Sequence, residues 1–301
     1  MINNYCIYPS PVLQPFVNQY ILATSEGKRV TYTSQWPAAY EVVMLFYLQD
    51  QPLHNTGFTE SALSGKNNYV VGPVTHDNGT VYFDGIYHTF IIEFKPGGFN
   101  KLFRIPMTEI TNKILCAEDV FGKIVKDFNE VLFNAKNVDE MAGSADQFFL
   151  SVLDHHNKML SIDCIGLLAS ELNNSNEFQT ISRYAGKSNM SLRSFERKFT
   201  DQIGISPKQY MQLVRFENAL TMKLMHPEKN WTSIAYECGY FDQMHMIRHF
   251  NRFTNRNPGA FLSDESTFTR SSINIFESDE PTLALLNISM AKEKFIHVKR
   301  R

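Results

Sequence analysis

The sequence lacks the features that define membrane-spanning and disulfide-stabilised proteins. Its longest apolar runs, such as EVVMLFYL, are far shorter than the roughly 20 residues that a membrane-spanning helix needs. The chain opens without a basic and then apolar leader, so we expect a cytoplasmic protein with no membrane partner. Only four cysteines are present and none forms a C-x-x-C pair, which predicts free, buried thiols in a reducing cytosol.

Motifs for catalysis and cofactor binding are also scarce. The segment KPGGFNKLF (95–103) has adjacent glycines but neither G-x-G-x-x-G nor a G-K-[ST] ending, so it predicts a strand-to-helix turn rather than a phosphate loop. His54, His76 and His88 are scattered, without the His-x-His pair that a metal site in a β barrel would use. No nucleophile stands at a recognisable spacing from a base. We therefore expect a protein that is not an enzyme, with no cofactor and no metal.

Net charge is close to zero, but the charges are unevenly distributed. Residues 1–150 contain 10 Lys and Arg against 15 Asp and Glu, which gives 10 − 15 = −5. Residues 177–262 contain 12 against 7, which gives 12 − 7 = +5. A basic module joined to an acidic one suggests that only the C-terminal end meets a polyanion.

The first part of the chain has the pattern of a small β domain. Short runs rich in Val, Tyr, Thr and Phe are separated by Gly, Pro, Asn and Asp: VTYTSQW, EVVMLFYLQ, NYVVGP, TVYFDG and YHTFIIEFKPGG. Helical spacing follows, and FGKIVKDFNEVLF places one apolar stripe on a helix: Phe121, Ile124, Val125, Phe128, Val131 and Leu132. We predict a β-rich domain with trailing helices over residues 1–150.

The second part reads as helical. Residues 151–176 are expected to form a helical linker that ends at the turn-prone NNSNE, and residues 177–262 an all-α domain. Residues 263–301 are a tail whose polar start resembles a linker and whose end has two strand-like runs. The tail could dock on the β domain or remain loose.

Two segments of the helical part can be aligned with each other. They are AGKSNMSLRSFERKFTDQIGISPKQY (185–210) and AYECGYFDQMHMIRHFNRFTNRNPGAF (235–261). After Phe199 and Phe250, both continue with four residues, Gly or Asn, one residue, Ser or Asn, Pro, two residues and an aromatic. A period of about fifty residues, present twice, indicates a duplicated structural unit.

Each copy carries the signals of a helix, a tight turn and a second helix. Asn189 and Gly239 stand where the first helix must end in a left-handed conformation. Ser191 and Asp242 follow as N-caps of the second helix. Two apolar pairs have the spacing of hydrophobic staples: Met190 with Phe195, and Phe241 with Met246. The pattern predicts two helix-turn-helix units.

Counting from each N-cap predicts which side chains of the second helix point outward. The fourth and eighth positions are apolar and face the core: Phe195, Phe199, Met246 and Phe250. The first, second, fifth and sixth positions lie on the opposite face: Leu192, Arg193, Glu196 and Arg197 in one unit, and Gln243, Met244, Ile247 and Arg248 in the other. Guanidinium and amide groups on such a face can read base edges in the major groove of double-stranded DNA.

His245 and His249 lie four residues apart, the spacing at which two imidazoles of one helix can bind a metal. Their equivalents in the first unit are Ser194 and Lys198, which cannot form a metal site. We therefore expect histidines that are partly buried or that contact phosphate, and metal binding is the less favoured alternative.

The segment between the units, SPKQYMQLVRFENALTMKLMHP, predicts one long helix that begins at the cap Ser206 with Pro207 in its first turn. A rigid helix would hold the two reading helices at a fixed separation, so that both enter successive major grooves. Attraction to phosphate is expected from five cations: Arg183, Lys187, Lys198, Arg252 and Arg256. The alternative is a helical bundle that contains a duplicated hairpin and binds no DNA.

The stretch RFENAL…WTSIAYECGYFDQMHMIRHFNRFTNRNPGAF resembles the signature region of AraC/XylS-type transcription regulators. The likeness extends over residues 178–262 and rests on the I-A-x-x-C-G-Y core, the Asp-Gln pair and the closing N-P-x-x-F. It implies base contacts from the outward positions given above, and RNA polymerase as a further partner. Met244 and Met246 depart from the family pattern, and Glu196 places an acid on the first reading face. The second helix is therefore expected to read DNA shape and thymine methyl groups more than hydrogen bonds.

The N-terminal half resembles, more weakly, the sensory-type domain of a subgroup of these regulators, over VVGPVTHDNG to ITNKI (70–114). This resemblance implies a cupin-like β core followed by helices, which binds a small-molecule effector or pairs subunits into a homodimer. We thus expect an α+β protein, with a cupin-like N-terminal domain and a C-terminal domain of two helix-turn-helix units, that regulates transcription. Two alternatives stay open: an enzyme whose β half is catalytic, and an adaptor that binds only proteins.

Overall fold

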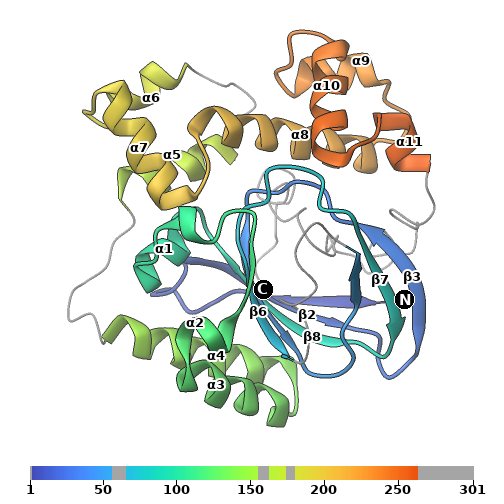
Figure 1. Cartoon of the computed structure of the whole chain (residues 1–301), viewed down its shortest axis with the longest axis vertical. Helices are drawn as coiled ribbons and strands as arrows, with labels where there is room; N and C mark the ends of the chain where they lie inside the picture. The colour runs from blue at the N-terminus through green and yellow to red at the C-terminus, as the bar shows by residue number, and fades with distance from the viewer. Residues whose placement is uncertain (1, 56–65, 155–162, 174–179, 264–301) are drawn as a thin grey trace, which may run out of the picture.

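The computed structural model describes residues 2–55, 66–154, 163–173 and 180–263 of the chain (Figure 1). A β-rich N-terminal domain with helices along one side lies below a row of helices that forms the C-terminal domain (Figure 1). The expected tail lies outside the described residues beyond Ser263, as does most of the NNSNE segment. In the part of the chain that is described, no helix is both long and apolar enough to cross a membrane.

The N-terminal domain is built from two antiparallel sheets. The strands are β1 (Asn3–Ile7), β2 (Val17–Thr24), β3 (Val30–Gln35), β4 (Val42–Tyr47), β5 (Leu53–Asn55), β6 (Asn68–Val71), β7 (Thr80–Gly85), β8 (His88–Phe94) and β9 (Ile114–Cys116). Six of them form one sheet in the order β1-β2-β8-β4-β6-β9, and three form a second in the order β3-β7-β5.

Strand β4 shows how the larger sheet is covered on both faces. All six of its residues are buried, and successive side chains point to opposite sides because a strand has a period of two. Val43, Leu45 and Tyr47 pack into the core between the two sheets. Met44 and Phe46 pack into a second core beneath the helices. A continuous apolar run is therefore required here, and EVVMLFYL supplies it.

Helix α1 (Gly98–Phe103) follows β8, and helices α2 (Ala117–Phe121), α3 (Lys123–Asn134) and α4 (Val138–Asp154) follow β9. Phe46 of β4 meets Phe128 of α3 edge-on with ring centroids 5.1 Å apart, and Phe128 stacks on Phe148 of α4 at 4.5 Å. These aromatic contacts fix the helical layer against the sheet.

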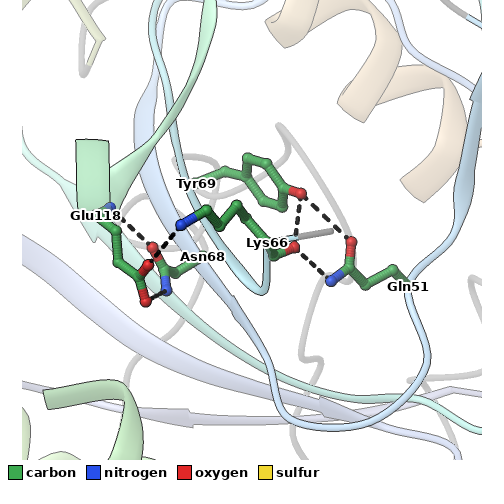
Figure 2. Close-up of polar contacts among 5 residues, drawn as sticks. All are labelled: Gln51, Lys66, Asn68, Tyr69 and Glu118. Atoms are coloured by element: carbon green, nitrogen blue, oxygen red, sulfur yellow. Dashed lines mark hydrogen bonds and ion pairs between the residues drawn. The ribbon is translucent and has the colours of Figure 1, made fainter. Parts of the chain in front are cut away.

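Polar contacts hold the start of β6 against the first turn of α2 (Figure 2). The Asn68 side-chain oxygen accepts from the Glu118 backbone N–H at 3.0 Å, and Lys66 Nζ pairs with Glu118 Oε2 at 3.0 Å. The Tyr69 hydroxyl donates to the Lys66 carbonyl at 2.6 Å, and Gln51 Nε2 donates to the same oxygen. This corner closes the edge of the large sheet where the chain enters the helices.

The C-terminal domain consists of helices around one core. They are α5 (Cys164–Asn173), α6 (Ile181–Lys187), α7 (Leu192–Ile203), α8 (Pro207–Met225), α9 (Trp231–Glu237), α10 (Gln243–Thr254) and α11 (Pro258–Ser263). Helix α5 comes from the segment expected to be a linker, and its Ile165, Leu168 and Leu172 are buried in this core. The two helix-turn-helix units lie at opposite ends of α8 (Figure 1).

The expected α+β fold class is confirmed, with β strands first and two helix-turn-helix units last. The five strands predicted from their composition are confirmed as β3, β4, β6, β7 and β8. Four others were missed, β1, β2, β5 and β9, because β5 and β9 are only three residues long and NNYCI and VNQYILAT carry little alternation. The trailing helix over 123–134 is also present, but Ile124 and Val131 of its predicted stripe are exposed.

The N-terminal domain contacts both helix-turn-helix units. Near the first unit, the Thr111 hydroxyl donates to the Gly204 carbonyl at 2.9 Å. Near the second, the Ala38 backbone N–H donates to the Phe253 carbonyl at 3.0 Å. Between them, the rings of Tyr40 and Tyr210 lie 4.8 Å apart. The two units are therefore connected both by α8 and by the β domain, which contacts each of them.

Candidate nucleic-acid interface

The first unit consists of α6, a tight turn and α7. Helix α6 is followed by Asn189 in a left-handed conformation (φ 53°), and the Met190 N–H donates back to the Ala185 carbonyl at 3.0 Å. Ser191 then caps α7 by accepting from the Ser194 N–H at 3.2 Å. Ala185 is buried, and its small side chain lets α6 and α7 pack closely.

The second unit repeats this backbone geometry. Gly239 has φ 72°, and the Tyr240 N–H donates to the Ala235 carbonyl at 2.9 Å, at the position that Met190 and Ala185 occupy in the first unit. Asp242 caps α10 by accepting from the His245 N–H at 2.6 Å. In both turns, a backbone N–H beyond the end of the first helix donates to a carbonyl in the last turn of that helix. This hydrogen bond is characteristic of a Schellman motif. The prediction of two helix-turn-helix units is confirmed.

The inward faces of α7 and α10 are apolar and fully packed. Each places two large side chains in the common core: Phe195 and Phe199 from α7, and Met246 and Phe250 from α10. Phe216 of α8 meets Phe250 with centroids 4.9 Å apart, and Tyr210 meets Phe199 at 5.5 Å. The long helix is thus locked to both units, which fixes the direction of each outward face.

On α7, the outward face carries the side chains expected from the count. Arg193, Glu196 and Arg197 are exposed, and Leu192 at the start of the helix is 43% exposed. This exposure holds with the N-terminal domain in place, since that domain contacts the other end of α7, at Gly204. Two guanidinium groups and one carboxylate are therefore presented together to solvent.

On α10, the outward face is less polar and less open. Arg248 is exposed and Met244 is 58% exposed, whereas Gln243 and Ile247 are half-buried. The Gln243 side-chain oxygen accepts from the Thr232 hydroxyl at 2.7 Å, which orients its amide and leaves the amide N–H groups as donors.

Phe241 was assigned wrongly to the second hydrophobic staple. Its side chain is 85% exposed, while Met246 is buried without it. In the first unit, Met190 does pack against the core. Phe241 directly precedes the cap of α10, so an exposed aromatic ring stands beside the outward face. Spacing gave no sign of this, because a staple and an exposed ring look alike in sequence.

His245 and His249 pack together against Tyr240. The two imidazole rings lie 4.6 Å apart, and the Tyr240 ring is 5.4 Å and 5.3 Å from them. Burial and then the charge of His245 lower the pKa of His249 to about 4, so this imidazole is neutral at pH 7. Among the described residues, no group of His, Cys, Asp or Glu is arranged to hold a metal ion.

The cations expected to attract phosphate have different surroundings. Arg183 and Lys198 are exposed, and Lys187 pairs with Glu171 at 2.6 Å. Arg252 donates to the Gln212 side chain at 3.2 Å and keeps an exposed position. Arg256 lies beside Gln35 and Asp77 of the N-terminal domain, so it belongs to the domain interface rather than to the phosphate-facing set.

Comparison with protein families decides which kind of helix-turn-helix this is. A family described as a helix-turn-helix domain matches residues 184–264, which contain both units and the helix between them. The C-terminal domain is of the AraC type. A second family, a domain of unknown function (DUF6597), matches residues 5–115 of the β domain.

Two of the curated proteins that are similar to this chain are transcriptional activators. The HTH-type transcriptional activator RhaS of Shigella boydii serotype 18 is 35% identical over 74 residues, 25% of this chain and 26% of that protein. RhaS of Escherichia coli O139:H28 is 36% identical over 69 residues, 23% of this chain and 24% of that protein. The match therefore spans about a quarter of the length of these relatives.

Among solved structures, ToxT from Vibrio cholerae O395 is similar at a TM-score of 0.41 and 13% identity, over 83% of this chain and 97% of that one.

Proposed function

We propose that this protein is a transcription regulator that binds double-stranded DNA sequence-specifically, with α7 and α10 in two successive major grooves. Residues 177–262 form the DNA-binding part and residues 1–150 the sensing or pairing part. Residues 151–176 join the two parts, and α5 of this segment packs in the core of the DNA-binding part. It acts in the cytoplasm by binding rather than by catalysis. The observation that carries the proposal is the pair of capped, outward-facing helices on a shared rigid scaffold.

The length of α8 supports the reading of two grooves. Its 19 residues correspond to about 28 Å at a rise of about 1.5 Å per residue. Successive major grooves on one side of B-DNA are about 34 Å apart. Because the two units are packed on opposite ends of α8, its length sets their separation near one turn of the duplex.

The side chains of α7 suit direct readout. Arg193 and Arg197 can each donate two hydrogen bonds to guanine, and Glu196 can accept from a cytosine amino group. Leu192 adds an apolar contact near the start of the helix. Ser191, whose hydroxyl already caps the helix, keeps the first turn and its N–H groups directed at the DNA backbone.

The side chains of α10 suit a mixed readout. Arg248 supplies the guanidinium, and the oriented amide of Gln243 can donate to a base edge. Met244 and Ile247 offer apolar contacts to thymine methyl groups, and Asp242 fixes the start of the helix through its cap. Arg183 and Lys198, exposed at the first unit, contribute phosphate contacts and salt-dependent affinity.

Arginine-to-alanine substitutions test the proposal. Arg197→Ala or Arg248→Ala is expected to weaken binding to the cognate site by about 1–3 kcal/mol and to relax the base preference at one position. Operator sites selected from random DNA serve as probes in competition gel-shift assays at fixed salt.

Two control variants separate base contacts from charge. Arg183→Ala, which removes an exposed cation from α6, should weaken binding equally for all sequences and reduce the salt dependence. Lys123→Ala on α3 removes an exposed cation far along the chain from the helix-turn-helix units and should change neither. Unchanged discrimination in both arginine variants would show that α7 and α10 do not read bases.

We also propose that the β domain responds to a small apolar effector. A cavity between the two sheets is lined mainly by Trp36, Leu45, Tyr47, Phe83 and Tyr87. Its volume of about 30 Å³ has room for only a few water molecules, so an effector must enlarge it on binding. Trp36 is two residues before Ala38, whose N–H bonds to Phe253 of the second unit. A ligand against Trp36 could therefore alter the contact with the DNA-binding domain.

A panel of small apolar and aromatic compounds tests the effector by thermal shift and by tryptophan emission. Ala23 also lines the cavity, so Ala23→Leu should fill it and abolish any shift while the chain stays folded. A shift that survives this substitution would place the ligand elsewhere. Pairing into a homodimer and contact with RNA polymerase complete the proposed partners, and light scattering with and without DNA tests the first of these.

A further inference from the structure

Two buried carboxyl groups from different domains lie close enough to interact with each other. Glu41 directly precedes β4 of the N-terminal domain, and Glu217 lies on α8 of the C-terminal domain. Each residue is only 8% exposed. Both carboxyl oxygens of Glu41 and Oε1 of Glu217 are fully buried, and among the described residues they have no hydrogen-bond partner at normal distance. The Tyr40 hydroxyl lies near both carboxyl groups and acts to lower the pKa of each, but burial outweighs it.

The surroundings of this pair are acidic and phenolic. Glu93 of β8 lies close enough to raise the pKa of Glu41, and it accepts hydrogen bonds from Gln19 at 2.8 Å and Asn18 at 2.9 Å. The buried hydroxyl groups of Tyr40 and Tyr210 flank the pair, and Tyr210 donates to Asn173 at 2.6 Å. Neither tyrosine carries a positive charge that could balance a carboxylate.

A small cavity lies beside Glu41, and one cation, Lys95, is among the residues that line it. It has a volume of about 10 Å³, and Glu41, Glu93, Lys95 and Gln202 contribute to its lining. Gln202 is in turn bonded to Asp163, which pairs with Lys101 at 3.0 Å. The cavity has room for about one water molecule, so bulk solvent cannot hydrate the two carboxyl groups in this arrangement.

Such a pair cannot carry two negative charges without a large penalty. Like charges at close range in a low-dielectric site raise the pKa of at least one partner, as does the loss of hydration. Burial and then the charge of Glu93 raise the pKa of Glu41 to about 8. Burial and then Glu41 raise the pKa of Glu217 well above its usual range. A proton on either carboxyl also supplies the missing hydrogen-bond donor.

We propose that Glu41 and Glu217 form a proton-controlled latch that holds the N-terminal domain against the DNA-binding domain. While the pair is protonated, the carboxyl groups hydrogen-bond across the interface. When the pair ionises, the charges repel each other and the interface opens, so that water can hydrate them. Opening requires only that the carboxyl groups release their protons to solvent, and no other bond is formed or broken.

The direction of the pH effect follows from where each state holds its protons. In the open arrangement both carboxyls are hydrated, with pKa values near about 4.3. The closed arrangement keeps protons to higher pH, so it is most stable at low pH. The closed arrangement loses stability as the pH rises above the pKa that the carboxyls have in the open arrangement. The loss ends at the pH where the closed pair has itself ionised. For Glu41 this window ends at about pH 8.

The latch sits between the contacts that the β domain makes with the two units. The Thr111 contact to Gly204 lies toward the first unit, and the Ala38 contact to Phe253 lies at the second. Opening the latch would free both units from the β domain while α8 still joins them. The latch itself does not depend on the proposed DNA binding.

Hydrogen exchange of the full-length chain tests the latch without DNA. The observable is protection of peptides that contain Ala38 and the segment after β3, corrected for the intrinsic pH dependence of exchange. In the wild type, the opening constant should rise by up to tenfold per pH unit for each carboxyl that ionises on opening, between about pH 5 and 8. Peptides from β3 and β7, within the β domain, provide the internal reference.

Three variants make the outcome decisive. The double variant Glu41→Gln, Glu217→Gln keeps the shape of the pair and removes both titrating groups, so its opening constant should change less than twofold across this range. Glu217→Leu, an apolar replacement of similar size, removes one of the two titrating groups, so it should lower the slope by up to one proton and leave the contribution of Glu41, whose pKa is raised mainly by burial and Glu93. Glu130→Gln, on the exposed surface of α3, should retain the wild-type slope.

A wild-type slope in both Glu217 variants would overturn the latch, as would protection that does not change with pH in the wild type. Recovery of protection at pH 8 on adding potassium or ammonium would also overturn it, because the cavity would then hold a cation instead of a proton. Loss of DNA binding with an intact pH response would refute the proposed function and leave the latch standing.

Discussion

Replacing Gly204 with alanine tests how closely the first helix-turn-helix unit must approach the N-terminal domain. Gly204 ends α7 with φ 94°, a conformation that an L-residue adopts at a cost of about 1–2 kcal/mol. A Cβ atom there would lie 2.4 Å from Thr111 Oγ1 and 3.2 Å from the Met107 carbonyl oxygen. Both of these atoms belong to the N-terminal domain, so the added methyl group pushes the domains apart.

The cost of this substitution can be estimated from these two effects. To make room, the Thr111 hydroxyl must move and lose its 2.9 Å bond to the Gly204 carbonyl, which removes about 0.5–1.5 kcal/mol. Together with the backbone term, Gly204→Ala should lower the free energy of unfolding by about 1.5–3.5 kcal/mol. Urea denaturation of the full chain, followed by circular dichroism, measures it.

A matched glycine and a second substitution identify the cause. Gly186 lies inside α6 with no atom near the position of an added Cβ, so Gly186→Ala should stabilise the chain by about 0.5–1 kcal/mol. Thr111→Ala removes the clashing hydroxyl, so the double variant Gly204→Ala, Thr111→Ala should be more stable than the sum of the single effects. Additive effects, or a Gly204→Ala variant as stable as Gly186→Ala, would refute the close contact between the domains.

Two further predictions concern the second unit. Asp242→Ala removes the cap of α10 and should lower the free energy of unfolding, measured by urea denaturation, by about 0.5–2 kcal/mol. Asp242→Asn keeps an acceptor for the His245 N–H and should lower it much less. Equal losses in the two variants would mean that the carboxylate charge, and not the cap, matters. Between pH 6.5 and about 4, unfolded His249 binds a proton that the folded chain excludes, so stability should fall with falling pH by up to about 1.4 kcal/mol per unit. His249→Leu should flatten this acid loss, and an unchanged pH profile in that variant would assign the loss to other groups.

Local features of the helix-turn-helix units could be predicted from sequence because they depend on neighbouring residues. The left-handed positions at Asn189 and Gly239 and the caps at Ser191 and Asp242 need only a few residues to form. The outward positions of Arg193, Arg197 and Arg248 then follow from helical geometry. Exposure of these side chains in the folded chain agrees with that count, while their contacts with DNA stay predictions.

Packing against distant segments could not be predicted in the same way. The stripe on α3 looked uniformly apolar, yet Val125, Phe128 and Leu132 are buried and Ile124 and Val131 are exposed. A helix meets a sheet over a narrow strip, and its rotation depends on the partner surface. Arg256 resembled a phosphate contact for the same reason, since only the fold brings Asp77 and Gln35 beside it.

The sequence by itself determined the duplicated unit, the caps, the turns and the charge difference between the two halves, because each of these is set by residue type at short spacing. Tertiary structure alone decided that the β domain bridges both units, that α5 joins the C-terminal core, and that Glu41 meets Glu217. A carboxyl group far along the chain from its partner carries no local signal. It becomes a titrating pair only when folding removes the water from both.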